Sequence, residues 1–170
     1  AEHARTFPLA VLRAVALAES GRRQGHQRAI IAWPWTVTAR GDGRYFATKS
    51  DAITHVRALR WDGVRNIDVG CMQINLMHHP HAFEGLEEAF DPGRNAAYAA
   101  DFLARLYDRS RSWSRAVAFY HSGSPSKGRA YWHRVEKLWN AERSRLFKQA
   151  RQTRIRAFRA RRAARLARAR

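Results

Sequence analysis

The stretch Ala16-Leu17-Ala18-Glu19-Ser20-Gly21 closes an apolar run that begins at Phe7, and it decides how the N-terminal part of the chain folds. Pro8 suits the first turn of a helix, and Gly21 can supply the left-handed residue just past the end of that helix. At about 100° per residue, Glu19 projects into the middle of the helix's apolar arc. The sequence therefore predicts an N-terminal helix with a carboxylate on its buried side.

Two effects act on the pKa of Glu19 in that position. Desolvation disfavours the charged carboxylate, and the negative end of the helix dipole disfavours it again. Both effects raise the pKa, and a carboxyl group that keeps its proton near neutral pH is what a general acid needs. Glu19 is therefore a candidate catalytic acid. The alternative is a helix-terminal glutamate that reaches water or pairs with Arg22 or Arg23.

Turn and capping residues predict the remaining elements. Two short alternating segments, Trp35 to Ala39 and Arg44 to Thr48, flank Gly41-Asp42-Gly43 and indicate a hairpin, and Val64 to Asp68 adds a short strand. Later helices are expected after Thr48 or Ser50 (through Arg60, stopped by Gly63), after Asp91-Pro92, after Ser112 (ending near Gly123), and from about Lys127 with Tyr131, Val135 and Leu138 on its apolar side. The expected fold class is α+β, mostly helical, with a small antiparallel sheet after the first helix.

Charge divides the chain into two parts. The sequence has 170 residues, 45% of them hydrophobic, and a formal net charge of +18. After Glu142 it holds twelve basic residues and no acidic one, with too few large apolar groups for a core. We expect a single domain over residues 1–142 and an Arg-rich tail over residues 143–170, helical or disordered, which binds an anionic polymer or surface.

Other features narrow the class of protein. The lone Cys71 forms no intrachain disulfide, and its apolar neighbours indicate a buried, inert thiol. No segment is long and apolar enough to cross a membrane, and a chain that begins at Ala1 fits a mature form whose signal peptide was removed. The spacing of His78, His79 and His81 does not match a zinc motif, so no metal site is predicted. Among the aromatic residues, Trp61 is expected in the core.

Three motifs occur in one order along the chain: Glu19-Ser20 at a helix end, Gly70-Cys71-Met72-Gln73-Ile74-Asn75 after the strands, and Tyr120-His121-Ser122-Gly123 at a later helix end. Together they resemble the SLT-type lytic transglycosylases and their goose-type lysozyme relatives over about residues 7 to 140. The resemblance implies a lysozyme-like fold, cleavage of peptidoglycan and no cofactor. It also implies a periplasmic or secreted protein, which we expect to be a monomer.

The resemblance assigns a role to each matching residue. Glu19 matches the family's single catalytic acid, and Ser20 would hydrogen-bond near that carboxylate or the substrate. Substrate-binding positions fall on Ser20, Met72, Gln73, Asn75, Tyr120 and His121. Tyr120 matches a tyrosine whose hydroxyl lies near the acid. His121 stands where the family usually has asparagine.

The residue at position 75 bears on the mechanism. Goose-type lysozymes carry an aspartate there, whereas this chain has Asn75, and an amide cannot act as a base at neutral pH. Asp42, in a predicted turn, and Asp68, which precedes the motif, are the other candidate second carboxylates, and neither is an obvious substitute. One-carboxylate chemistry is therefore favoured: Glu19 acts as acid and then as base, and a 1,6-anhydro muramic acid end forms. The alternatives are a hydrolytic lysozyme and a basic nucleic-acid- or envelope-binding protein without catalysis.

Partners follow from the same features. The expected ones are peptidoglycan glycan strands and, through residues 143–170, an anionic envelope surface. Nucleic acid is the rival on charge alone, but the tail lacks interleaved aromatic residues and the body lacks a nucleic-acid-binding signature. We therefore do not expect it as the partner.

Overall fold

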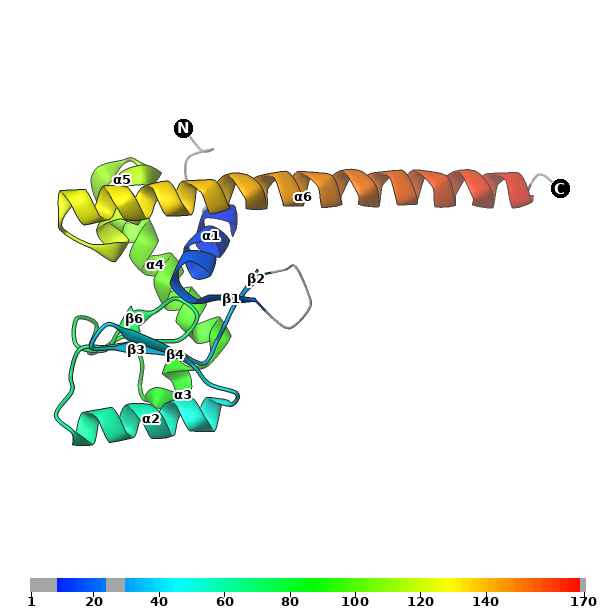
Figure 1. Ribbon diagram of the computed structural model, residues 1–170. Helices are drawn as coiled ribbons and strands as arrows, with labels where there is room; N and C mark the ends of the chain where they lie inside the picture. The colour runs from blue at the N-terminus through cyan, green and yellow to red at the C-terminus, as the bar shows by residue number, and fades with distance from the viewer. Residues whose placement is uncertain (1–8, 24–29, 169–170) are drawn as a thin grey trace.

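The computed structural model describes residues 9–23 and 30–168, which form a mostly helical α+β fold (Figure 1). The elements are α1 (Leu9–Ser20), β1 (Gly21–Arg23), β2 (Ile30–Ala32), β3 (Thr36–Ala39), β4 (Asp42–Tyr45), α2 (Lys49–Trp61), β5 (Ile67–Val69), β6 (Ile74–Asn75), α3 (Leu86–Ala89), α4 (Pro92–Ser110), α5 (Trp113–His121) and α6 (Pro125–Arg168). This confirms the predicted fold class. The expected first residue of the opening helix, Pro8, lies outside the described residues.

The main sheet has four antiparallel strands in the order β4-β3-β5-β6. The predicted hairpin is present, but its turn is Arg40-Gly41 rather than Gly41 to Gly43. Both turn residues have positive φ, 55° and 80°, as a tight two-residue hairpin turn requires. A second, two-stranded sheet pairs Gly21 with Ala32. Sequence analysis missed this sheet because β1 is three residues long and mostly charged: Gly21, expected as a left-handed residue after the first helix, instead begins β1 without a positive φ.

Side-chain caps start three of the helices as predicted. Thr48 accepts a hydrogen bond from the backbone N–H of Asp51 at 3.1 Å at the start of α2. Asp91 caps α4 at 2.8 Å, and Ser112 caps α5. Each cap satisfies a donor that the first helical turn leaves without an intrahelical partner.

The described residues form two apolar cores. One is formed by α1, α4, α5 and α6, and the other by the main sheet with α2 and α3 (Figure 1). Trp61 belongs to neither: it is 91% exposed, so its predicted core position was wrong. At about 100° per residue, Trp61 points about 140° away from the buried Val56 on the same helix.

The turn over residues 70–75 joins the two cores, and the buried amide of Asn95 on α4 holds it. Asn95 Oδ1 accepts the N–H of Met72 at 2.9 Å, while its Nδ2 donates to the carbonyls of Val69 and Ala89 at 3.1 and 3.0 Å. Gly70 has φ of 81°, and a Cβ there would lie 2.3 Å from Asn95 Nδ2. The glycine is therefore required both by the backbone conformation and by the close approach of the amide.

Helix α6 continues without a break from the domain into the Arg-rich segment and extends well beyond the body (Figure 1). Glu142 forms ion pairs with Arg13 of α1 at 3.1 Å and with Arg145 at 2.8 Å, and the pair with Arg13 ties the middle of α6 to the domain. The division at residue 142 stays a prediction. No helix among the described residues is long and apolar enough to cross a membrane.

Replacing Asn95 with alanine should lower the free energy of unfolding by about 3 kcal/mol, because three buried backbone groups lose their partners at once. Urea denaturation measures this loss. The matched control is Asn140→Ala on the exposed part of α6, which should change stability by no more than about 0.5 kcal/mol. Equal stability of the two variants would contradict the role given to Asn95.

Candidate active site

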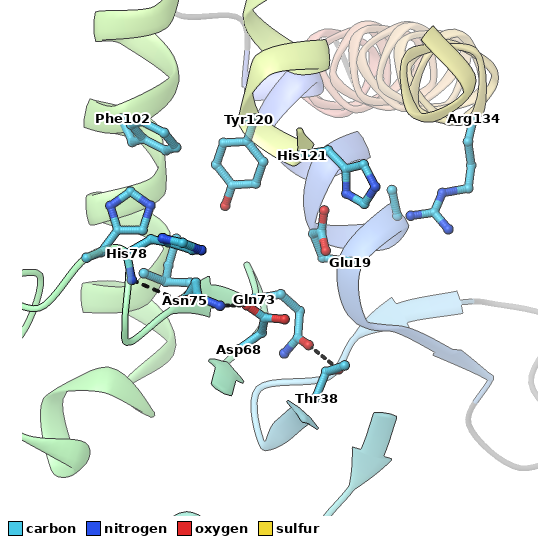
Figure 2. Close-up of a pocket in the computed structure, with 13 residues that line it drawn as sticks. Glu19, Thr38, Asp68, Gln73, Asn75, His78, Phe102, Tyr120, His121 and Arg134 are labelled. Atoms are coloured by element: carbon cyan, nitrogen blue, oxygen red, sulfur yellow. Dashed lines mark hydrogen bonds between the residues drawn. The ribbon is translucent and has the colours of Figure 1, made fainter. Parts of the chain in front are cut away.

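Glu19 lies near the C-terminal end of α1 and lines a cavity of about 450 Å³, which we call the Glu19 pocket (Figure 2). Its other lining residues are Ala18, Thr38, Asp68, Gln73, Ile74, Asn75, His78, His79, Phe102, Tyr120, His121 and Arg134. They come from α1, the main sheet, the turns on either side of β6, α4, α5 and α6. The pocket therefore lies between the helical core and the sheet, where segments far apart in the sequence meet.

The carboxyl group of Glu19 is partly open to the pocket and otherwise enclosed by protein. Its Oε1 accepts a hydrogen bond from the hydroxyl of Tyr131 at 2.5 Å. Burial raises the pKa of Glu19 to about 7, against the opposing effects of the Tyr131 hydrogen bond and the positive charge of Arg134; the negative charge of Asp68 raises it further. A group with this pKa can both give and take a proton near neutral pH.

The alternative pairing of Glu19 with Arg22 or Arg23 is not found among the described residues. Arg22 lies over the rings of Trp33 and Tyr45, at 4.8 and 5.5 Å from their centroids. The carboxyl group thus points inward, as the helix geometry predicts.

Tyr131 is the site residue that sequence reasoning missed, because it was assigned only to the apolar side of the last helix. Its side chain is 4% exposed, and its ring stacks on His121 with centroids 4.3 Å apart and planes 3° apart. A buried tyrosine hydroxyl needs a hydrogen-bond partner, and this need is the signal that could have identified Tyr131. The partner, Glu19, lies 112 positions earlier in the sequence.

Tyr120 lines the Glu19 pocket, but its hydroxyl donates to the carbonyl of Met72 at 2.7 Å rather than to Glu19. Burial raises the pKa of Tyr120 well above its usual value, and the charge of Glu19 raises it further. The hydroxyl therefore stays protonated and anchors the turn. His121 follows it in the pocket wall, and burial lowers the pKa of His121, as do the nearby charges of Arg134 and Lys127.

Two expected substrate-binding residues do not reach the pocket. Ser20 is fully buried, and its hydroxyl donates to the carbonyl of Cys71 at 2.7 Å, because one residue beyond Glu19 the helix points into the core. Met72 is 1% exposed and packs in the helical core. Neither residue lines the Glu19 pocket, and in this structure both fix the position of the turn; the substrate contacts expected of Ser20 and Met72 stay predictions.

Gln73 lines the pocket, but its amide is engaged in holding the sheet. Nε2 donates to the carbonyls of Gly70 and Thr36 at 2.9 and 3.2 Å, and Oε1 accepts from the Thr38 hydroxyl at 2.5 Å. Its backbone φ is 49°, which directs the side chain back across the turn. Only the second lone pair of Oε1 is left for a ligand.

Asn75 also lines the pocket with its amide occupied. Its Oδ1 accepts the backbone N–H groups of Met77 and His78, both at 3.0 Å. Its Nδ2 donates to Asp68 Oδ1 at 2.7 Å and to Asn66 Oδ1 at 2.5 Å. Asn75 thus orients the carboxylate of Asp68.

Asp68, on β5, lines the same pocket as Glu19 (Figure 2). Burial raises its pKa, while the hydrogen bond from Asn75 and the charge of His78 lower it. Sequence reasoning gave this residue little weight because it precedes the motif, but its strand partner in the sheet is Asn75. Asp42, the other candidate second carboxylate, is exposed on the hairpin, pairs with Arg44 at 2.9 Å and does not line the pocket.

The single cysteine, Cys71, and the histidines after the turn do not form a metal site in the described part of the chain. Cys71 is buried, and burial raises its pKa to about 11, which confirms the inert thiol. His79 lies 2.9 Å from the hydroxyl of Tyr98, and His78 lines the pocket. Within residues 9–23 and 30–168, no three His, Cys, Asp or Glu side chains are arranged to hold a metal ion.

Comparison with known protein families gives one match: the transglycosylase SLT domain, over residues 1–138. No curated protein and no solved structure matches the chain. The matched span includes Glu19, the turn over residues 70–75 and the α6 residues that face the pocket.

Replacing Tyr131 with phenylalanine should raise the pKa of Glu19 by about one pH unit, because a hydrogen bond to a charged group contributes about 1.5 kcal/mol. The shift is upward since the lost bond stabilises the carboxylate. NMR titration of carboxyl-labelled glutamate, assigned with Glu19→Gln, measures it. The control Tyr120→Phe removes a hydroxyl that bonds to Met72, and it should shift the Glu19 titration far less. A larger shift in the control would contradict this assignment.

Proposed function

Because the chain belongs to the transglycosylase SLT family, whose members are peptidoglycan lytic transglycosylases, we propose that it cleaves the β-1,4 bond from MurNAc to GlcNAc with Glu19 as the catalytic residue. The product on the muramic acid side is a 1,6-anhydro sugar. The reaction takes place outside the cytoplasm, at the peptidoglycan layer, and we assign the protein to the periplasm or the secreted fraction.

The proposed reaction uses one carboxyl group twice. Protonated Glu19 gives its proton to the glycosidic oxygen as the bond from this oxygen to C1 breaks. The resulting carboxylate takes the proton of the C6 hydroxyl, whose oxygen forms the new bond to C1. One C–O bond breaks and one forms, the net proton movement is from O6 to the leaving oxygen, and no water is consumed.

The observation that carries this proposal is the pKa of about 7 at Glu19, inside a pocket bordered by the helical core and the sheet. A group that must act as acid and then as base works best with a pKa near the ambient pH. Tyr131 supports both states, since its hydroxyl can donate to the carboxylate and remain beside the acid.

Asp68 supports a second candidate function, hydrolysis. Hydrolytic glycosidases use two carboxyl groups, one as acid and one as base or nucleophile. Asp68 shares the pocket with Glu19 and is oriented by Asn75. In the transglycosylase reaction the same carboxylate would stabilise positive charge developing at C1, so its presence is compatible with both reactions.

Digestion of purified sacculi distinguishes the two functions. Glu19→Gln should lower turnover at least a thousandfold, because proton transfer and charge stabilisation are both lost. Wild-type products should carry anhydro ends, each lighter by one water than a reducing end, which mass spectrometry detects. Asp68→Asn should reduce the rate without changing the kind of product. If the wild-type products carried only reducing ends, and if Asp68→Asn no longer released them, the proposal would be replaced by hydrolysis.

The extension of α6 supports binding to an anionic envelope surface. From Arg143 to Arg162 its side chains include nine basic residues and no acidic one. Among the described residues of this segment, only Arg145 forms an ion pair. At about 1.5 Å per residue, the helix over residues 143–168 spans about 39 Å. We propose that this segment holds the enzyme at its substrate layer by charge.

Deleting residues 149–170 should weaken binding to sacculi about tenfold at low salt and much less at high salt, since exposed charges are screened. The deletion leaves the contacts of Glu142 with Arg13 and Arg145 intact. A matched variant with glutamine at every arginine after residue 150 keeps the helix length and should behave like the deletion. Co-sedimentation measures both, and equal binding with and without the charges would contradict the anchoring role.

A further inference from the structure

Glu19 borders two cavities. Besides the Glu19 pocket, it lines a second cavity of about 780 Å³, which we call the α6 pocket and whose wall includes Tyr45, His133, Arg134 and Lys137. Both cavities share Ala18, Glu19 and Arg134. A chain of sugars with its scissile bond at Glu19 therefore has room on both sides of that bond.

The α6 pocket has a positive wall. Arg134 and Lys137 are three residues apart on α6 and so lie on the same helix face, one turn from each other. Glu19 is the only acidic residue in the lining of this pocket. Lys137 forms no ion pair with a residue that the structure describes, and His133 has its own partner in Glu136 at 3.6 Å.

Arg134 stands at the boundary between the two pockets. Its guanidinium carbon lies 5.2 Å from the ring centroid of Tyr131, and its side chain extends from α6 toward Glu19 (Figure 2). The Glu19 pocket, in contrast, contains a second carboxylate, Asp68, on its sheet side. Positive charge is thus concentrated on one side of the acid, where the ammonium group of Lys137 has no acidic partner within residues 9–23 and 30–168.

The substrate carries carboxylates in a matching arrangement. In a peptidoglycan strand GlcNAc is neutral, whereas each MurNAc bears a lactyl group whose carboxyl is either free or joined to a stem peptide with carboxylates of its own. Anionic groups therefore occur on every second sugar. A positive wall on one side of the acid would favour one of the two possible registers of the alternating strand.

Building on the proposed function, we infer that Arg134 and Lys137 bind the carboxylate of a MurNAc substituent and thereby set the register of the glycan strand. Binding in this register brings the bond from MurNAc to GlcNAc to Glu19 rather than the bond from GlcNAc to MurNAc. Arg134 and Lys137 are then specificity-determining residues, and the exposed ring of Tyr45 offers a face on which a sugar can stack.

Binding in a Glu19→Gln background tests this inference independently of turnover. The ligands are soluble glycan strands with stem peptides, strands stripped by an amidase, and stripped strands whose lactyl carboxylates are methyl esters. Lys137→Gln and Arg134→Gln should each weaken binding of the carboxylate-bearing strands roughly tenfold. They should leave binding of the ester strands unchanged. The first two ligands show whether the stem peptide or the lactyl group supplies the carboxylate.

The control is Arg57→Gln on α2, which removes an equal charge that lines neither pocket and should leave binding of every strand unchanged. Equal weakening on charged and ester strands, or no weakening on either, would overturn the inference while wild-type cleavage of sacculi still supported the proposed function. Conversely, if Arg134 and Lys137 bound only the carboxylate-bearing strands but the wild type cleaved none of them, the proposed function would be overturned and the inferred register of binding would still be supported. In an active Lys137→Gln enzyme, KM should rise and kcat should hold.

Discussion

The structure depends on one constraint, the fixation of the turn over residues 70–75 by the buried amide of Asn95. This amide uses both its donor and its acceptor capacity on backbone groups of residues 69, 72 and 89. Two hydroxyls from other helices, those of Ser20 and Tyr120, bond to carbonyls of the same turn. Three helices and the sheet are therefore all bonded to this turn. Because Ser20 is bonded to it, the turn also fixes the position of the neighbouring Glu19.

The pKa of Glu19 results from effects that act against each other. Burial alone would hold the proton too firmly for a base, and the hydroxyl of Tyr131 with the charge of Arg134 partly reverses this. Both opposing groups come from α6, the element most distant in sequence from α1. The attachment of α6 to the domain, reinforced by Glu142 and Arg13, therefore matters for the chemistry as well as for stability.

Capping residues and helix periodicity predicted much of the fold. They could not predict contacts between segments that lie far apart in the sequence. The caps at Thr48, Asp91 and Ser112 act within four residues, so the sequence reveals them directly. The inward direction of Glu19 follows from helix periodicity. Tyr131 was missed because its partner lies on another helix, and Ser20 does not line the Glu19 pocket since adjacency to the acid in sequence does not mean adjacency to the pocket. The amide of Gln73 donates to two backbone carbonyls, those of Gly70 and Thr36, and no sequence pattern indicates that these carbonyls lie within its reach.

The pairing of a carboxylate on β5, Asp68, with an amide on β6, Asn75, bears on the mechanism. Asn75 suggested that a second acid was missing, yet its partner across the β5–β6 pair is Asp68, and the amide donates to that carboxylate. Position 75 therefore supplies orientation, and position 68 supplies the charge. The transglycosylase reaction that we propose and its hydrolytic alternative would begin alike, with a proton from Glu19 and positive charge developing at C1 in the pocket that Asp68 shares. The two reactions differ in which oxygen bonds to C1, that of the C6 hydroxyl or that of water. If a strand bound on the α6 side has its own C6 hydroxyl beside Glu19, the C6 oxygen is favoured over water, because it is already held next to C1 and does not have to diffuse there.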